Sequence, residues 1–208
     1  MIQMMGAVFG LAAGILFGRY QLKRWNMDSK KSMAVLAAGS AIVFLAGGYL
    51  MLQYEYHILK MIRYWILMYS LLLLAMLDSR DRLIPNKALL VLLGVRTVLL
   101  AADCACFPQL IMEILISSVV GLAGGGGIFL LAGLIARKGI GMGDVKMIGV
   151  IGYYLGFQVL MSDLIITMTF TVLGGLAVLA FRKASLHSEM AFAPYAAAGT
   201  IITILMGF

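Results

Sequence analysis

Long apolar runs separated by short polar segments recur from one end of the chain to the other. A membrane-spanning helix needs roughly 20 apolar residues, with about 17–25 tolerated. The pattern therefore predicts about eight spanning helices, near residues 2–18, 33–53, 62–78, 88–105, 110–136, 145–158, 160–181 and 191–207. Because no stretch of about ten residues alternates polar and apolar positions, membrane strands are disfavoured. We expect an all-α polytopic helix bundle in which residues 1–208 form one domain.

Composition supports a lipid environment. Hydrophobic residues make up 63% of the 208 residues and charged residues 12%, against about 45–50% and about 25% in soluble domains. This balance excludes a soluble enzyme, a disordered protein and a disulfide-built secreted module. The two cysteines, Cys104 and Cys106, are spaced C-x-C and form no paired CxxC motif. We therefore expect no metal site and no cofactor.

The net charge of +7 indicates orientation in the membrane. Thirteen of the sixteen basic residues fall in four polar segments that alternation places on one side. They are Arg19, Lys23, Arg24, Lys30, Lys31, Arg80, Arg82, Lys87, Arg137, Lys138, Lys146, Arg182 and Lys183. The positive-inside rule makes that side cytoplasmic and places the N-terminus outside. No basic residue precedes the first apolar run, so we expect it to be retained rather than cleaved as a signal peptide. Basic residues distributed in this way also exclude a nucleic-acid surface.

Two of the nine acidic residues lie at matching depth. Asp78 ends the apolar run at 69–77, and Asp144 begins a later one, so both lie at the cytoplasmic boundary. Acidic groups at the edge of spans are costly, which makes them functional candidates. Two carboxyl groups that share one proton perform aspartyl proteolysis. The alternative is two unrelated acids that balance nearby arginine and lysine side chains.

Three short motifs surround these acids. The first is Gly141-Met142-Gly143-Asp144-Val145-Lys146, a GxGD sequence. The second runs from Asp78 to Pro85-Asn86, and the third is Phe192-Ala193-Pro194-Tyr195. In this order and combination, from about residue 70 to the end of the chain, they resemble the type IV prepilin peptidase family, the bacterial branch of intramembrane GxGD aspartyl proteases.

The resemblance implies a membrane aspartyl endopeptidase that removes the basic leader of a prepilin or pseudopilin at the cytoplasmic boundary of the bacterial plasma (inner) membrane. Carried onto this chain, the catalytic pair is Asp78 and Asp144, with Asp81 as competitor for the first position. Because the chain's surface is itself basic, we expect recognition through the apolar helix that follows the leader rather than through charge. The oligomeric state stays open.

The other motif residues would shape the site. Gly141 and Gly143 would form the turn that presents Asp144. Pro85 and Asn86 would stop a loop and start a helix, since proline at a first helical turn loses no hydrogen bond. We also expect Lys146 either to reach toward water or to tune Asp144, and Pro194 to kink the last helix.

The chain departs from longer family members in one respect. Those members carry two CxxC pairs in a zinc-binding insertion between the first two spans, linked to N-methylation of the new pilin terminus. Here that loop covers only about residues 19–32 and has no cysteine. We expect a short-form peptidase, with methyltransferase activity in doubt.

Further expectations concern single residues. Because a helix dipole favours an anion at its N-terminus, we expect Asp144 to be the base and Asp78 to hold the shared proton. Depth along two neighbouring spans predicts an ion pair between Arg96 and Glu113. We expect no role for Glu55, Asp103 or Asp163.

Glycines suggest how the helices pack. Gly6, Gly10, Gly14 and Gly18 form a small-residue stripe that predicts a packing face. The run at 124–127 predicts a hinge, a kink or a tight crossing, without choosing among them.

Three rival functions remain. A presenilin-like or signal-peptide-peptidase-like GxGD protease would carry a Pro-Ala-Leu motif, which this chain lacks. A transporter or channel could bind a cation between Asp78 and Asp144, although transporters usually show internal repeats. A structural membrane scaffold would leave the combined motifs unexplained.

Overall fold

The computed structural model describes residues 39, 47–48, 53–54, 56–135, 140–182 and 190–207. The regular elements in this part of the chain are helices. They are α3 (Ile58–Asp81), α4 (Asn86–Cys106), the 3-10 turn η1 (Pro108–Leu110), α5 (Ile111–Ile135), α6 (Met142–Leu155), α7 (Phe157–Arg182) and α8 (Ala193–Leu205). The six α-helices match the six segments predicted from residue 62 onward. The segments predicted at 2–18 and 33–53, with their glycine stripe, lie almost entirely outside the described residues.

Four of these helices are long and apolar enough to cross a membrane: Ile58–Asp81, Asn86–Cys106, Pro108–Ile135 and Phe157–Ala180. The predicted helical membrane bundle is confirmed to that extent. Helices α6 and α8 have 14 and 13 residues, or about 20 Å at 1.5 Å per residue, against an apolar bilayer core of about 30 Å. The count of about eight spans and the outside N-terminus stay predictions.

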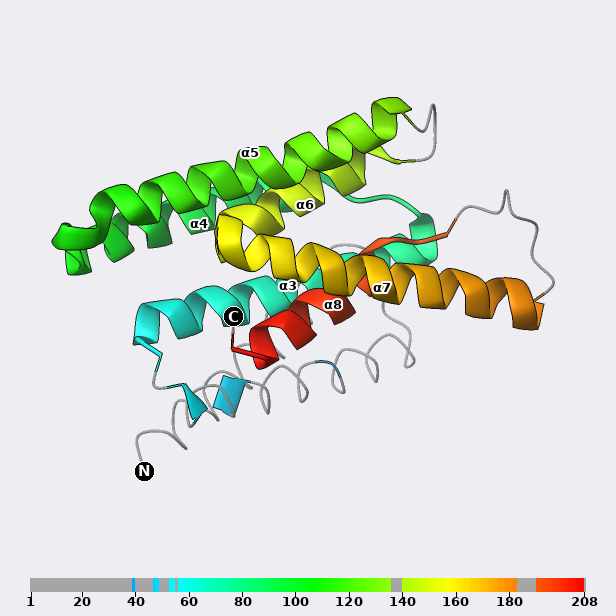
Figure 1. Cartoon of the computed structure of the whole chain (residues 1–208), viewed down its shortest axis with the longest axis horizontal. Helices are drawn as coiled ribbons and strands as arrows, with labels where there is room; N and C mark the ends of the chain where they lie inside the picture. Colours follow the sequence, from blue (N-terminus) through cyan, green and yellow to red (C-terminus); the bar gives the residue numbers. More distant parts are fainter. Residues whose placement is uncertain are drawn as a thin grey trace.

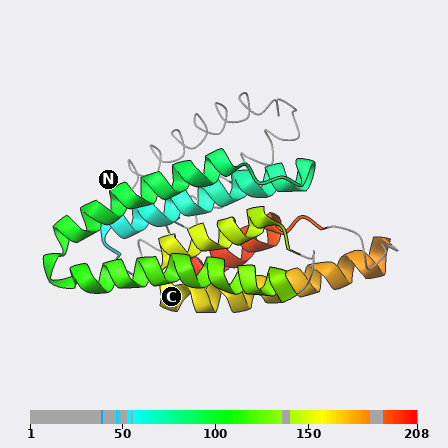
Figure 2. The same ribbon diagram turned by 90° about the horizontal axis from the view of Figure 1, so that it is seen from above.

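Helix α6 lies inside the bundle. The six helices run broadly along the long axis of the molecule (Figure 1), and the view from above shows the same alignment (Figure 2). Helix α6 packs against α3, α4, α5 and α7, and its residues from Met147 to Leu155 are all buried. A short helix that is buried all round is protected from lipid by its neighbours. These neighbours also fix the position of the first turn of α6 within the bundle.

A glycine crossing brings α5 and α6 into close contact. A Cβ added to Gly121 or to Gly152 would collide with the carbonyl of the other residue, and one at Gly125 would lie 2.8 Å from the Ile148 oxygen. Small residues let helix backbones approach in this way. Because α5 is continuous through the glycine run at 124–127, Gly125 serves helix packing rather than a hinge.

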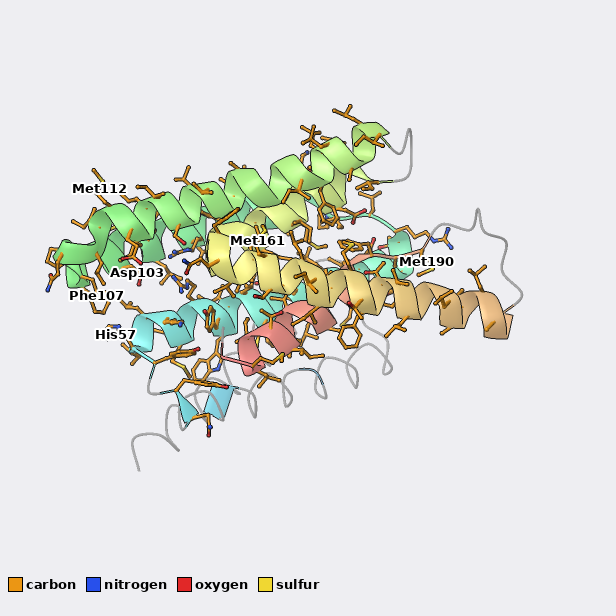
Figure 3. The ribbon with its side chains drawn as sticks, in the orientation of Figure 1. His57, Asp103, Phe107, Met112, Met161 and Met190 are labelled. Carbon is orange, nitrogen blue, oxygen red and sulfur yellow. The ribbon has the colours of Figure 1, made fainter. Side chains whose placement is uncertain are left out.

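Arg96 forms a buried polar cluster that differs from our prediction. Its side chain is 1% exposed and donates to Asp103 Oδ2, Ser118 Oγ and the Tyr153 carbonyl, each at 3.0 Å. The predicted pair with Glu113 is wrong, because Glu113 is exposed on α5. Figure 3 shows Asp103 with His57 and Phe107 at one end of the bundle. The cluster joins α4, α5 and α6 there.

The outer surface of the long helices is apolar. Large side chains such as Val98, Met112 and Ile165 are strongly exposed. A soluble monomer rarely exposes so much continuous apolar area. Lipid is the solvent that this surface fits.

Candidate active site

Asp78 lies in the last turns of α3, in the interior of the bundle. Its residue is 6% exposed. The helix ends three residues later, where Arg82 adopts a left-handed conformation (φ 50°) and donates its N–H to the Asp78 carbonyl at 2.9 Å. This closing turn is a standard way to satisfy the final carbonyls of a helix. The end of α3 therefore holds the backbone of Asp78 in place, with its side chain in the interior.

Asp144 lies in the first turn of α6, outside the four candidate spans, and is half-buried. Burial, and next the negative charge of Asp78, raise the pKa of the Asp144 carboxyl from 3.8 to about 6, while a hydrogen bond from the Gly141 backbone opposes the rise. The effect of Asp78 shows that the two carboxyls lie within electrostatic reach, although they are far apart in sequence. One proton held between two such groups suits acid–base chemistry.

A backbone donor completes the surroundings of Asp78. The Ala193 N–H, at the start of α8, donates to Asp78 Oδ2 at 2.9 Å, and both groups are buried. Pro194 follows in the first turn of α8. The expectation that Pro194 kinks the last helix is wrong, because it begins the helix, where its missing N–H costs nothing.

The two glycines of the GxGD motif have little room for a side chain. A Cβ on Gly143 would lie 3.1 Å from the Ile84 Cβ, and one on Gly141 would lie 3.2 Å from Asp144 Oδ2. Ile84 is buried in the α3–α4 connection, next to Pro85, which precedes the first residue of α4. Gly143 thus allows the start of α6 to lie directly against the segment that follows Asp78.

Asn86 and Lys146 meet at the surface beside this contact. Lys146 Nζ donates to Asn86 Oδ1 at 2.9 Å, and both side chains are exposed. The bond joins the first turn of α4 to that of α6. The charge that acts on Asp144 is that of Asp78 rather than that of Lys146.

Asp81, the competitor for the first catalytic position, lies elsewhere. Its side chain is 54% exposed and forms a 3.6 Å ion pair with Arg80. The structure therefore places Asp78 in the interior near Asp144, and Asp81 on the surface.

The contacts oppose our assignment of the shared proton. The N-terminus of α8, through the Ala193 N–H, lies against Asp78, and a charge-assisted bond of this kind stabilises a carboxylate. Asp144 instead has a raised pKa. Sequence reasoning missed Ala193 because it acts through its backbone, and its one signal was the adjacent Pro194.

Comparison with known proteins gives a consistent result. The model of the type IV leader peptidase family matches residues 65–180. A prepilin leader peptidase/N-methyltransferase from Bacillus subtilis (strain 168) is 32% identical over 140 residues, which cover 66% of this chain and 52% of that protein. A protein with the same name from Pseudomonas putida is 30% identical over 142 residues, or 68% of this chain and 48% of its own length.

The chain thus spans about half the length of these curated relatives. No solved structure matches it.

Proposed function

Because this chain belongs to the type IV leader peptidase family, we propose that it is a membrane aspartyl endopeptidase that removes the leader from prepilins or pseudopilins. The observation that carries the proposal is the placement of two acids from separate helices within electrostatic reach: Asp78 is buried, and the pKa of Asp144 is raised by burial and next by the charge of Asp78. Aspartyl proteolysis requires two carboxyl groups that are coupled in this way.

Asp78 acts as the base and Asp144 as the acid in this mechanism. The Asp78 carboxylate, oriented by the Ala193 N–H, takes a proton from a water molecule whose oxygen attacks the scissile carbonyl carbon. Asp144 gives its proton to the carbonyl oxygen. When the tetrahedral gem-diol collapses, the C–N bond breaks, the proton on Asp78 passes to the leaving amine, and one hydroxyl proton of the diol returns to Asp144. Both carboxyls cannot be ionised together at short distance, which keeps one proton in the pair.

The reaction takes place at the cytoplasmic face of the bacterial inner membrane in this proposal. The ends of α3 and the starts of α4, α6 and α8 bring Asp78, Asn86, Asp144 and Ala193 into one region. The topology expected from the sequence puts thirteen of the sixteen basic residues on this side of the membrane, which favours the cytoplasmic side. An apolar substrate helix would reach the site by packing against the exposed apolar faces of the bundle.

We extend to this chain the peptidase half of its relatives' printed name, and not the N-methyltransferase half. The 208 residues contain two cysteines and no paired CxxC motif. In the described residues no three histidine, cysteine or acidic side chains come together in a way that could hold a metal ion.

The test is cleavage of a candidate prepilin by the purified protein in liposomes, followed by mass spectrometry of the product. We expect Asp78→Asn and Asp144→Asn each to abolish cleavage, because each removes one carboxyl of the pair. Asp81→Asn is the matched control and keeps cleavage, since Asp81 lies on the surface. Cleavage that survives in either of the first two folded variants would remove that residue from the catalytic pair.

A further inference from the structure

Asp163 is a carboxyl that the proposed mechanism does not use. It lies on α7, two residues after Met161, which is labelled in Figure 3. Its side chain is 0% exposed, and neither carboxyl oxygen forms a hydrogen bond of standard geometry with a described residue. An ionised carboxyl buried without a partner is among the costliest arrangements in a protein.

The groups around Asp163 are neutral. The hydroxyls of Thr200 and Thr203, on α8, are the polar groups that act on its carboxyl. Helices α5, α6 and α8 all pack against α7. Their titratable residues are Glu113 on α5, Asp144, Lys146, Tyr153 and Tyr154 on α6, and Tyr195 on α8. None of these exerts a charge effect on Asp163, so within the described residues no cation balances an Asp163 anion.

The direction of one hydrogen bond favours the neutral form. Thr203 Oγ1 donates its single proton to the Gly199 carbonyl at 3.0 Å. It can therefore offer only lone pairs to Asp163. The Thr200 hydroxyl has no hydrogen-bond partner among the described residues, so it can donate to the other carboxyl oxygen in either protonation state of Asp163. Lone pairs accept a hydrogen bond from a protonated carboxyl and repel an ionised one.

Helices α7 and α8 lie side by side in close contact at this level (Figure 1). A Cβ added to Gly199 would collide with Thr167 of α7. Thr203 lies ten residues after Ala193 on the same helix, or about 15 Å along its axis. Because α8 is a single short helix, a shift at Thr203 also moves the Ala193 N–H that contacts Asp78.

We propose that Asp163 holds a proton, donates it in a hydrogen bond to Thr203 Oγ1, and thereby fixes α8 so that Ala193 stays on Asp78. Asp163 is then a positioning residue of the active site. This role rests on the proposed function for its effect on cleavage. The protonated state of Asp163 does not rest on it and can be tested separately.

The first experiment is infrared spectroscopy of the purified protein at about neutral pH. We expect a protonated-carboxyl stretching band that loses intensity in Asp163→Asn and keeps it in Asp81→Asn, the exposed control. If Asp163→Asn leaves the band unchanged, Asp163 is ionised and the proposal fails. Because this readout needs no substrate, it decides the matter even when the protein cleaves no prepilin.

The second experiment measures prepilin cleavage. Asp163→Asn imitates the protonated carboxyl, so we expect kcat within about twofold of the original protein and a weaker dependence of kcat on rising pH. Thr203→Val and Asp163→Leu should each lower kcat by about 10²-fold, the cost of a displacement of about 1 Å. An inactive Asp163→Asn, or activity that requires Na⁺ in place of choline, would instead indicate a cation site and overturn the proposal.

Discussion

Gly143 shows how much the site depends on the absence of one side chain. A methyl group there would press on Ile84 at 3.1 Å, and Ile84 is buried in the core. We expect Gly143→Ala to lower kcat by about 10-fold or more, because the start of α6 must move away from Asp78. Gly94→Ala is the matched control, since nothing lies within 4 Å of its added Cβ. Equal activity in the two variants would show that Gly143 has no close-packing role.

The raised pKa of the Asp144 carboxyl predicts that the free energy of unfolding depends on pH. Its pKa rises from 3.8 in a solvated chain to about 6 in the fold, so the folded state binds the proton more tightly than the unfolded state does. The folded protein therefore loses stability as pH rises from about 4 to about 6. Asp144→Asn carries no charge and avoids that loss.

We therefore expect Asp144→Asn to raise the midpoint of thermal unfolding in detergent at about pH 7.5, and to leave it nearly unchanged at about pH 4. For a chain of this size the gain is about 2–4 °C for each kcal/mol relieved. Asp81→Asn, at an exposed position, should change the midpoint little at either pH. A lower midpoint for Asp144→Asn at the higher pH would contradict the cause assigned to the raised pKa.

At the scale of helices, Arg96 holds three elements together and should be the most sensitive position outside the site. Among the described residues, Arg96→Met leaves the buried Asp103 carboxyl with the weaker Arg63 contact at 3.5 Å alone. Breaking a buried pair of this kind costs about 3 kcal/mol or more. We expect a large fall in the unfolding midpoint, which Asp103→Asn in the same chain should partly restore.

Glu113→Gln provides the control for Arg96, because the two were expected to pair and the structure separates them. The exposed Glu113 should tolerate the change with little effect. If Glu113→Gln destabilised the protein as much as Arg96→Met, the original pairing would be correct and the observed cluster would not.

The sequence predicted where the helices lie but not which side chains contact one another between helices, and the reason is physical. Apolar runs set the length and depth of a helix, so the segment predicted at 88–105 appears as Asn86–Cys106. The depth of a residue in the membrane does not determine how its helix is rotated about its own axis, and that rotation decides which neighbours the side chain meets. Arg96 and Glu113 were expected to match in depth, but Arg96 points into the bundle and Glu113 is exposed. Asp103, by contrast, follows Arg96 by seven residues, on the same face of α4. That i, i+7 spacing was a readable signal.

The contacts of Ala193 and Asp163 were harder to predict from the sequence. The N–H of Ala193 is a backbone group, so residue type could not reveal that it contacts Asp78. The burial of Asp163 follows from how α7 faces α8. Thr167 and Thr171 follow Asp163 at intervals of four residues, and this polar stripe on one face of α7 was a signal that we did not use. Asp78 and Asp144 were found because carboxyls are rare in this chain and therefore conspicuous.

For the whole molecule, orientation in the membrane is the property that decides whether the site can meet a cytoplasmic leader. Cys106 is exposed near the end of α4, the end opposite to Asn86. Leu83 is 67% exposed in the α3–α4 connection, close in sequence to Asp78. The charge distribution predicts that the Cys106 end lies outside and the Leu83 end inside.

A membrane-impermeant maleimide tests this orientation on intact cells, after removal of the outer membrane where there is one. In Cys104→Ser protein, we expect Cys106 to be labelled without permeabilisation. In a chain with Leu83→Cys, Cys104→Ser and Cys106→Ser, we expect labelling only after the membrane is opened. Cys104→Ser/Cys106→Ser protein is the unlabelled control. The reverse pattern would place Asp78 and Asp144 on the outer face, and a peptidase acting on cytoplasmic leaders would then be ruled out.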